Sequence, residues 1–136
     1  GAGILDTGFA GNKPIINVHP GIIPTSRGLD SFKWAIHEGD PLGITIHLID
    51  DEVDKGDILT IRHTPVFSTD TLQTIARRHY ELEITLMRNA LQYLDNRIEM
   101  YAPEKPAHMR MPKDIEAEMI RRFPEWKAKM VTKDLE

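Results

Sequence analysis

The chain is 136 residues long, carries a formal net charge of −4 and has no cysteine. This length suits one domain with its own core, and the missing cysteines exclude disulfide scaffolds, thiolate metal sites and cysteine nucleophiles. The chain has no basic block larger than a short pair such as Arg77-Arg78, so we expect no nucleic acid partner. It has no apolar run long enough to span a bilayer, so we expect no membrane segment and a cytoplasmic location.

Residues 3–11 carry three glycines around Ile4, Leu5 and Phe9, which predicts a short helical or turn segment with one apolar side. The chain starts at Gly1-Ala2-Gly3 without an initiator methionine, and these residues are typical of the interior of a fold. Asn12-Lys13-Pro14 is turn chemistry that leads into the first predicted strand.

Residues 14–20, Pro-Ile-Ile-Asn-Val-His-Pro, predict a buried strand with two polar side chains in its second half. Because strand side chains alternate, Asn17 and His19 share one face while Ile16 and Val18 share the other. Pro20 ends the strand and leaves the amide and the imidazole at its carboxyl end, where open α/β sheets bind ligands. On this pattern alone, the pair is either a site for chemistry or two hydrogen-bonded side chains that cap a strand.

Two prolines and two glycines make residues 20–28 a loop directly after this polar pair. Arg27 in the loop is either a ligand for a substrate phosphate or carboxylate, which its planar guanidinium suits, or a solvated loop arginine. Asp30 then predicts the N-cap of a short helix over residues 31–38, which Gly39 ends.

Residues 43–50 alternate as a strand does. One face carries Ile44, Ile46 and Leu48, and the other carries Thr45, His47 and Ile49. An acidic loop closed by Gly56 follows, and residues 57–64 return as the next strand. The connection is too short for a crossover helix, so the two strands are predicted to pair antiparallel.

Asp70 followed by Gln73 is a capping-box signature. The helix that it starts extends to about Leu94, with apolar residues at three- and four-residue steps. His79 falls on that apolar face, and we interpret it as a packed histidine rather than a ligand.

The C-terminal part begins with an extended, proline-spaced segment at residues 103–112. Residues 113–130 predict a last helix that is interrupted near Pro124. Its expected apolar contacts are Ile115, Met119, Phe123 and Trp126.

Several motifs occur in an order that resembles the formyltransferases that use 10-formyltetrahydrofolate. They are Asn17-Val-His19-Pro20-Gly21, Ile22-Ile23-Pro24, Arg27-Gly28, Ala35-Ile36-His37-Glu38-Gly39, Gly43-Ile-Thr-Ile-His47, Asp54-Lys-Gly56 and Ile58. This group includes glycinamide ribonucleotide, methionyl-tRNA and sugar N-formyltransferases. The Arg27-Gly28 pair and the tail His108-Met-Arg-Met111-Pro112 look most like the sugar enzymes.

The resemblance implies an α/β fold, a mixed sheet with flanking helices that forms the C-terminal half of a formyltransferase-like fold. Residues 1–102 would be part of the catalytic domain, and residues 103–136 an extended segment and a helix packed on it. In the family a βαβ half precedes the Asn-x-His strand. A sheet without that half has an exposed edge, which predicts pairing with a second copy as a homodimer.

The resemblance also implies three catalytic residues, Asn17, His19 and Asp54. The Asn17 amide would donate a hydrogen bond to the oxygen that becomes negative during transfer. His19 would donate to that oxygen or move the amine proton, and Asp54 would orient His19 or a water molecule.

The same resemblance implies the ligands. The backbone of Ile49, Asp50, Asp51 and Val53 would line the pterin pocket for the co-substrate 10-formyltetrahydrofolate, and Arg27 would bind the acceptor. The acceptor is expected to be a small-molecule amine, an amino sugar nucleotide in particular.

Other interpretations stay open at this stage. The chain is alternatively a 10-formyltetrahydrofolate hydrolase, or an incomplete module that binds or assembles without catalysis. The acidic loop lacks the ligand spacing of an EF-hand, and no H-E-x-x-H spacing supports zinc at His19, His37, His47 and Asp54. We therefore assign no metal.

Overall fold

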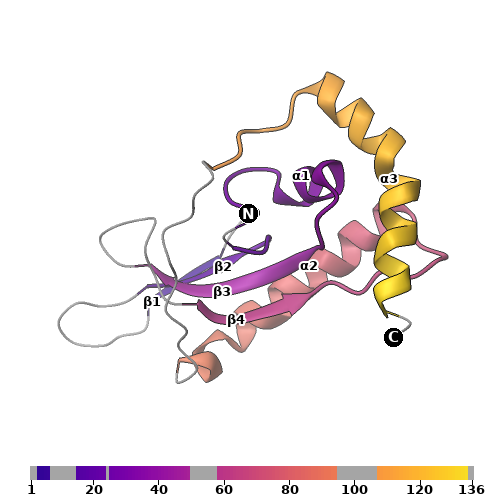
Figure 1. Cartoon of the computed structure of the whole chain (residues 1–136). Helices are drawn as coiled ribbons and strands as arrows, with labels where there is room; N and C mark the ends of the chain where they lie inside the picture. The colour runs from indigo at the N-terminus through magenta and orange to yellow at the C-terminus, as the bar shows by residue number, and fades with distance from the viewer. Residues whose placement is uncertain (1–2, 7–14, 24, 50–57, 95–106, 135–136) are drawn as a thin grey trace.

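The computed structural model describes residues 3–6, 15–23, 25–49, 58–94 and 107–134. Its elements are β1 (Gly3–Asp6), β2 (Ile15–His19), α1 (Ser31–Glu38), β3 (Gly43–Ile49), β4 (Ile58–His63), α2 (Leu72–Arg88), the 3₁₀ helix η1 (Ala90–Tyr93) and α3 (Lys113–Asp134). The strands form one sheet, α2 runs along it, and α1 lies beside α3 (Figure 1). The expected α/β fold with flanking helices is confirmed.

The sheet has the order β1-β2-β3-β4, and each neighbouring pair is antiparallel. The predicted antiparallel pairing of β3 with β4 is therefore confirmed. Among the described residues, parallel pairing of the kind a mixed sheet contains is limited to one isolated bridge, between Gly28 and His108.

The first strand corrects the expectation of a helical or turn segment near the N-terminus. Residues Gly3–Asp6 form β1, which pairs with β2 so that Ile4 lies opposite Asn17. The glycines suggested a turn, but the open edge of β2 supplies hydrogen-bond partners that a four-residue segment lacks by itself. Tertiary pairing thus decides the conformation of this segment.

One hydrophobic cluster fills the space between the sheet and α2. It contains Ile16, Val18, Ile44, Ile46, Leu48, Leu59, Leu86 and Ala90. The strand residues in it are those predicted to share one face by alternation. Because α2 covers this face, Asn17, His19, Thr45 and His47 must project from the opposite face.

A second cluster joins α1 to α3. Its buried members are Ala35, Ile36, Leu42, Val66, Ile75, Met111, Met119, Trp126 and Met130, and Ile115 and Phe123 pack against it. The apolar contacts predicted for the last helix are confirmed.

Three side chains of α3 also donate hydrogen bonds to carbonyl groups at the end of α1. Arg122 reaches the carbonyl of His37, Trp126 that of Asp40, and Lys129 that of Gly39. These are carbonyls that the end of a helix leaves without intrahelical partners. The sequence predicted an interruption near Pro124, but α3 continues through this residue. We attribute the continuity to the packing of α3 on α1, which outweighs the one hydrogen bond that the proline removes.

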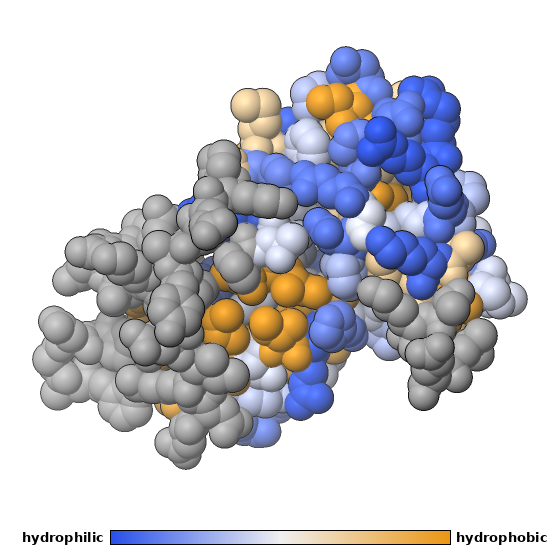
Figure 2. Space-filling view, in the orientation of Figure 1, coloured by the Kyte–Doolittle hydropathy of each residue, from blue (hydrophilic) through white to orange (hydrophobic). Residues whose placement is uncertain are grey.

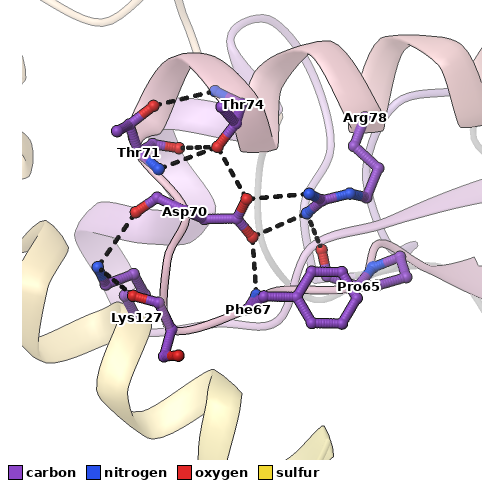
Figure 3. A network of polar contacts seen from close by, with 8 residues as sticks. Pro65, Phe67, Asp70, Thr71, Thr74, Arg78 and Lys127 are labelled. Atoms are coloured by element: carbon purple, nitrogen blue, oxygen red, sulfur yellow. Dashed lines mark hydrogen bonds and ion pairs between the residues drawn. The ribbon is translucent and has the colours of Figure 1, made fainter.

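The N-terminus of α2 begins one residue later than predicted. Thr71 is the N-cap, and it exchanges hydrogen bonds with Thr74 in a capping box. Asp70 instead accepts from the Phe67 amide, from Thr74 and from both terminal nitrogens of Arg78 (Figure 3). The helix also ends earlier than Leu94: Asn89 is its C-cap, and η1 follows from Ala90.

We expect Asp70→Asn to destabilise the fold. Asp70 is 6% exposed, and its pKa lies well below its usual range, chiefly because Arg78 donates to it. Removing one partner of a buried pair costs about 2–4 kcal/mol, which urea unfolding would measure. Glu118→Gln is the control, because Glu118 pairs with Arg121 and Arg122 at the surface and exposed pairs contribute little. Equal losses in the two variants would contradict this account.

Apolar and hydrophilic side chains are unevenly distributed over the surface. Figure 2 shows apolar side chains gathered over the sheet, whereas the outer side of α3 is mainly hydrophilic. Within the part of the chain that the structure describes, no helix combines the length and apolar character needed to cross a bilayer.

Candidate active site

Asn17 and His47 meet in the middle of the sheet. They are direct cross-strand partners on β2 and β3, and Asn17 Nδ2 lies 2.8 Å from His47 Nε2. Both side chains are buried. The predicted placement of Asn17 on the face opposite Ile16 and Val18 is consistent with this pairing and with the position of those two residues in the core under α2.

The hydrogen bond fixes the tautomer of His47. An amide nitrogen donates, so His47 Nε2 accepts and the ring proton lies on Nδ1, which is buried and has no hydrogen-bond partner among the residues that the structure describes. Burial, together with a smaller contribution from the nearby His19, lowers the pKa of His47 to about 4. A neutral imidazole therefore holds one N–H of Asn17 and orients its amide.

His19 lies at the end of β2, inside the loop that follows. Its Nε2 lies 2.6 Å from the carbonyl oxygen of Ser26 and 3.3 Å from the hydroxyl of Ser31. A carbonyl only accepts, so Nε2 carries the proton and the lone pair of the ring is on Nδ1. Burial lowers the pKa of His19, the Ser26 bond opposes this, and the charge of Arg27 adds to the lowering. His19 is therefore neutral at pH 7 and able to accept a proton.

Thr45 holds the start of the loop against β3. Its hydroxyl donates to the carbonyl of Gly21 at 2.7 Å and accepts from the amide of Ile23 at 3.1 Å. Gly21 is packed so closely that a Cβ there would lie 2.6 Å from the Ser26 oxygen. The loop thus wraps tightly around the His19 ring.

Residues 107–112, here called the strap, hold the far side of the same loop. The amide of Leu29 donates to the carbonyl of His108, and the amide of His108 donates to the carbonyl of Arg27. The His108 ring stacks on Trp34 at 4.7 Å and pairs with Glu38 at 2.9 Å. The strap therefore fixes the backbone on both sides of Gly28.

Asp30 precedes α1, as predicted, but does not cap it with its side chain. Its backbone is left-handed, with φ 55°, and its carboxylate accepts from the amide of Met111 in the strap at 2.9 Å. The local N-cap pattern was correct in position and wrong in mechanism, because a partner 81 residues away in sequence takes the carboxylate.

Several predicted site residues lie outside the described residues, namely Asp50, Asp51, Val53 and Asp54. Ile49 ends β3 and pairs with Ile15, whereas His19 pairs with Thr45. Ile49 lies four residues after Thr45 on β3, so it is about 13 Å along the strand from the position beside His19. Arg27 lies in the loop, close enough for its charge to act on His19.

The zinc alternative had placed His37 beside His19 and His47. His37 lies on α1, where its ring meets the edge of Trp34 at 5.8 Å. Within the described ranges, no three histidine or carboxylate side chains are grouped so as to hold a metal ion. The calcium alternative concerns residues 50–57, which are outside those ranges.

The sequence did not indicate that His47 pairs with Asn17, nor that Thr45 and Ser26 shape the loop. The sequence did contain a pattern that could have found the strand residues. Thr45 and His47 lie on one face of their strand, opposite the apolar residues, as Asn17 and His19 do on theirs. When two neighbouring strands each have a polar face, these faces can form one shared polar surface.

Acid is expected to destabilise this fold through its buried histidines. The pKa values of His19, His47 and His79 all lie below 6.5, mainly because of burial. The unfolded chain takes up protons at about pH 6.5, so the free energy of unfolding falls as the pH drops below that value. His47, with a folded pKa of about 4, contributes about 3 kcal/mol of the loss. Urea titrations between about pH 7 and pH 4 would measure the free energy of unfolding. His47→Gln should make this free energy depend less on pH, and an unchanged pH dependence would contradict the expectation.

Comparisons with known proteins identify the family of this chain. The family model described as formyl transferase matches residues 9–91, more than half of the chain. The chain belongs to the formyl transferase family.

The names of its relatives indicate different formyl acceptors. The chain is 37% identical over 76 residues to phosphoribosylglycinamide formyltransferase of Haemophilus influenzae, which covers 55% of this chain and 35% of the relative. It is 33% identical over 105 residues to dTDP-4-amino-4,6-dideoxyglucose formyltransferase of Mycobacterium tuberculosis, covering 74% and 44%. The chain thus spans less than half the length of these relatives.

Solved structures give the same fold. The formyltransferase PseJ from Anoxybacillus kamchatkensis, in complex with UDP-4,6-dideoxy-4-formamido-L-AltNAc and tetrahydrofolate, matches with a TM-score of 0.60 and 26% identity, over 79% of this chain and 63% of that one. A sugar N-formyltransferase from Shewanella sp. FDAARGOS_354 matches with a TM-score of 0.54 and 25% identity, over 79% and 50%.

Proposed function

We propose that the protein transfers a formyl group from 10-formyltetrahydrofolate to the primary amine of an amino sugar nucleotide. Membership of the formyl transferase family supports the reaction. The acceptor class is supported by a relative named for a dTDP-amino sugar and by a structural neighbour whose title names a UDP-formamido sugar and tetrahydrofolate.

In this proposal the amine nitrogen attacks the formyl carbon, and the bond from that carbon to N10 of the folate breaks. The amine loses a proton and N10 gains one, so no oxidant or further reactant is needed. The second N–H of Asn17 donates to the formyl oxygen as it becomes negative. His19, neutral and with its lone pair on Nδ1, takes up the amine proton, and Asp54 orients His19.

The ligand contacts are part of the same proposal. Arg27 would bind a phosphate of the acceptor, because its guanidinium suits that group and its charge acts at His19. Ile49, Asp50, Asp51 and Val53 would line the pterin pocket.

The observation that carries the proposal is the hydrogen bond between Asn17 and His47 beside the enclosed His19. A buried amide whose orientation is set by a neutral imidazole is a preorganised donor, and such donors stabilise developing charge. Within the described residues, the buried Nδ1 of His47 has no partner, and an unsatisfied buried group of this kind calls for an explanation, which a role in the site supplies.

The domain division is also a proposal. Residues 1–102 would form part of the catalytic domain, and residues 103–136 would brace it; the contacts of the strap with the loop and of α3 with α1 support this division. Homodimer formation through a sheet edge stays a prediction, which light scattering would test.

The test uses the full-length protein with 10-formyltetrahydrofolate and dTDP-4-amino-4,6-dideoxyglucose. Mass spectrometry should detect the formamide product, and tetrahydrofolate should form in equal amount. Formate released at the same rate without the amine would favour the hydrolase instead. No heat of binding with folinic acid in calorimetry would favour the non-catalytic module, and either result would overturn the proposal.

A further inference from the structure

His79 is a buried histidine of α2 that the proposed chemistry does not use. It is 5% exposed and lies where three parts of the chain meet. Its Nε2 is 3.1 Å from the carbonyl oxygen of Pro20, its Nδ1 is 2.6 Å from the hydroxyl of Thr64, and its ring packs beside Phe32 with centroids 5.6 Å apart. It therefore connects the end of β2, the exit of β4 and α1.

Its two hydrogen bonds define a single tautomer. The Pro20 carbonyl only accepts, so His79 Nε2 carries the proton, and Nδ1 accepts from the Thr64 hydroxyl. Burial lowers the pKa of His79, and the nearby His19 acts in the same direction. The ring is thus a neutral connector with one donor and one acceptor, each satisfied.

The donor acts at the peptide between Pro20 and Gly21, one residue beyond His19. His19 is held on its other side by Ser26, and Gly21 between them leaves no space for a Cβ. If the Pro20 carbonyl lost its partner, the buried acceptor would turn toward water, and the His19 ring would turn with it. A misplacement of about 1 Å in a catalytic group is enough to lower turnover about 100-fold.

We propose that His79 is a positioning residue, which orients His19 for proton transfer by donating from Nε2 to the Pro20 carbonyl while its Nδ1 accepts from the Thr64 hydroxyl. This inference rests on the proposed function for its kinetic part. It assigns His79 no contact with either substrate.

Three variants of the full-length protein test it. His79→Leu fills the space but removes both hydrogen bonds, whereas the amide of His79→Gln provides a donor for Pro20 and an acceptor for Thr64. Thr64→Val keeps the shape of the side chain and removes the hydroxyl that donates to His79 Nδ1. A residue that only packs would tolerate leucine as well as glutamine.

We expect His79→Leu to lower kcat about 10- to 100-fold with both KM values nearly unchanged, His79→Gln to recover most of kcat, and Thr64→Val to fall between them. Unchanged kcat in His79→Leu, or a loss that glutamine does not recover, would overturn the inference. If His79→Leu does not fold, Thr64→Val decides: unchanged kcat overturns the inference.

A second readout does not depend on formyl transfer. Nitrogen-15 NMR of the imidazoles reports which nitrogen of His19 is protonated. Thr64→Val and His79→Leu should move the His19 signals away from the Nε2–H form, while His79→Gln should keep them. Unmoved His19 signals would overturn the inference even if the proposed function holds, and moved signals would support it even if that function fails.

Discussion

Asn17→Ala and His19→Ala are each expected to lower kcat of formyl transfer by about 100-fold or more. Asn17→Ala removes the amide that His47 orients, which in the proposed mechanism donates to the formyl oxygen. His19→Ala removes the neutral imidazole, which in the same proposal takes up the amine proton. Steady-state kinetics with the amino sugar nucleotide would measure both losses.

The matched control is His63→Ala, which removes an exposed imidazole from the end of β4. It should leave kcat unchanged within experimental error. Turnover of both site variants within about tenfold of the parent would contradict the assignment. The pH dependence of kcat should change in His19→Ala and stay the same in Asn17→Ala, because only the imidazole titrates. This difference would match the two proposed roles.

Gly28→Ala is expected to be the most damaging small substitution in the loop. Gly28 has φ 88°, and a Cβ there would lie 2.2 Å from the carbonyl oxygen and 2.6 Å from the amide nitrogen of His108. The strap would have to separate from the loop, which breaks the two backbone hydrogen bonds between Arg27, Leu29 and His108. Backbone strain together with these losses costs about 3 kcal/mol or more.

Gly39→Ala separates the two contributions. Gly39 has φ 80°, but the nearest atom to its added Cβ would be the flexible Lys129 Nζ at 3.8 Å. This variant should lose only the cost of the left-handed conformation, about 1 kcal/mol. Urea unfolding of both variants measures the difference, and hydrogen exchange at the amides of Leu29 and His108 should be faster in Gly28→Ala alone. Equal losses would contradict the close packing of the strap.

The alternation of the sequence was sufficient to predict β2 and β3. Each has a run in which every second residue is apolar and buried, as with Ile44, Ile46 and Leu48, so the local pattern and the packed sheet agree. By contrast, β4 was predicted as the strand that returns after the acidic loop, and Leu59 is its one buried residue. β1 has no such run and forms because an edge of β2 is available. Its conformation depends on a partner, which local patterns do not describe.

Helix termini show the same division between local and distant information. Gly39 ends α1 in the left-handed conformation that its sequence predicts. By contrast, Asp30 turns its carboxylate to Met111, and Asp70 turns its carboxylate to Arg78. Their roles depend on residues that only the folded chain brings near.

The candidate site was predictable in part. Because strand side chains alternate with a period of two residues, the sequence predicted that Asn17 and His19 share one face of a strand that ends at Pro20. The pairing of Asn17 with His47 depends on the register of β2 against β3, and a slip of one residue would have turned His47 to the other face. The enclosure of His19 depends on Thr45, Ser26 and the strap, which come from three separate parts of the chain.

The most direct test of the central claim is NMR of the full-length protein during titration with folinic acid, a stable formyl folate. The account predicts that the side-chain amide signals of Asn17 and the imidazole signals of His19 shift with saturation, while those of the exposed His63 do not. Saturable binding that leaves Asn17 and His19 unmoved would contradict it.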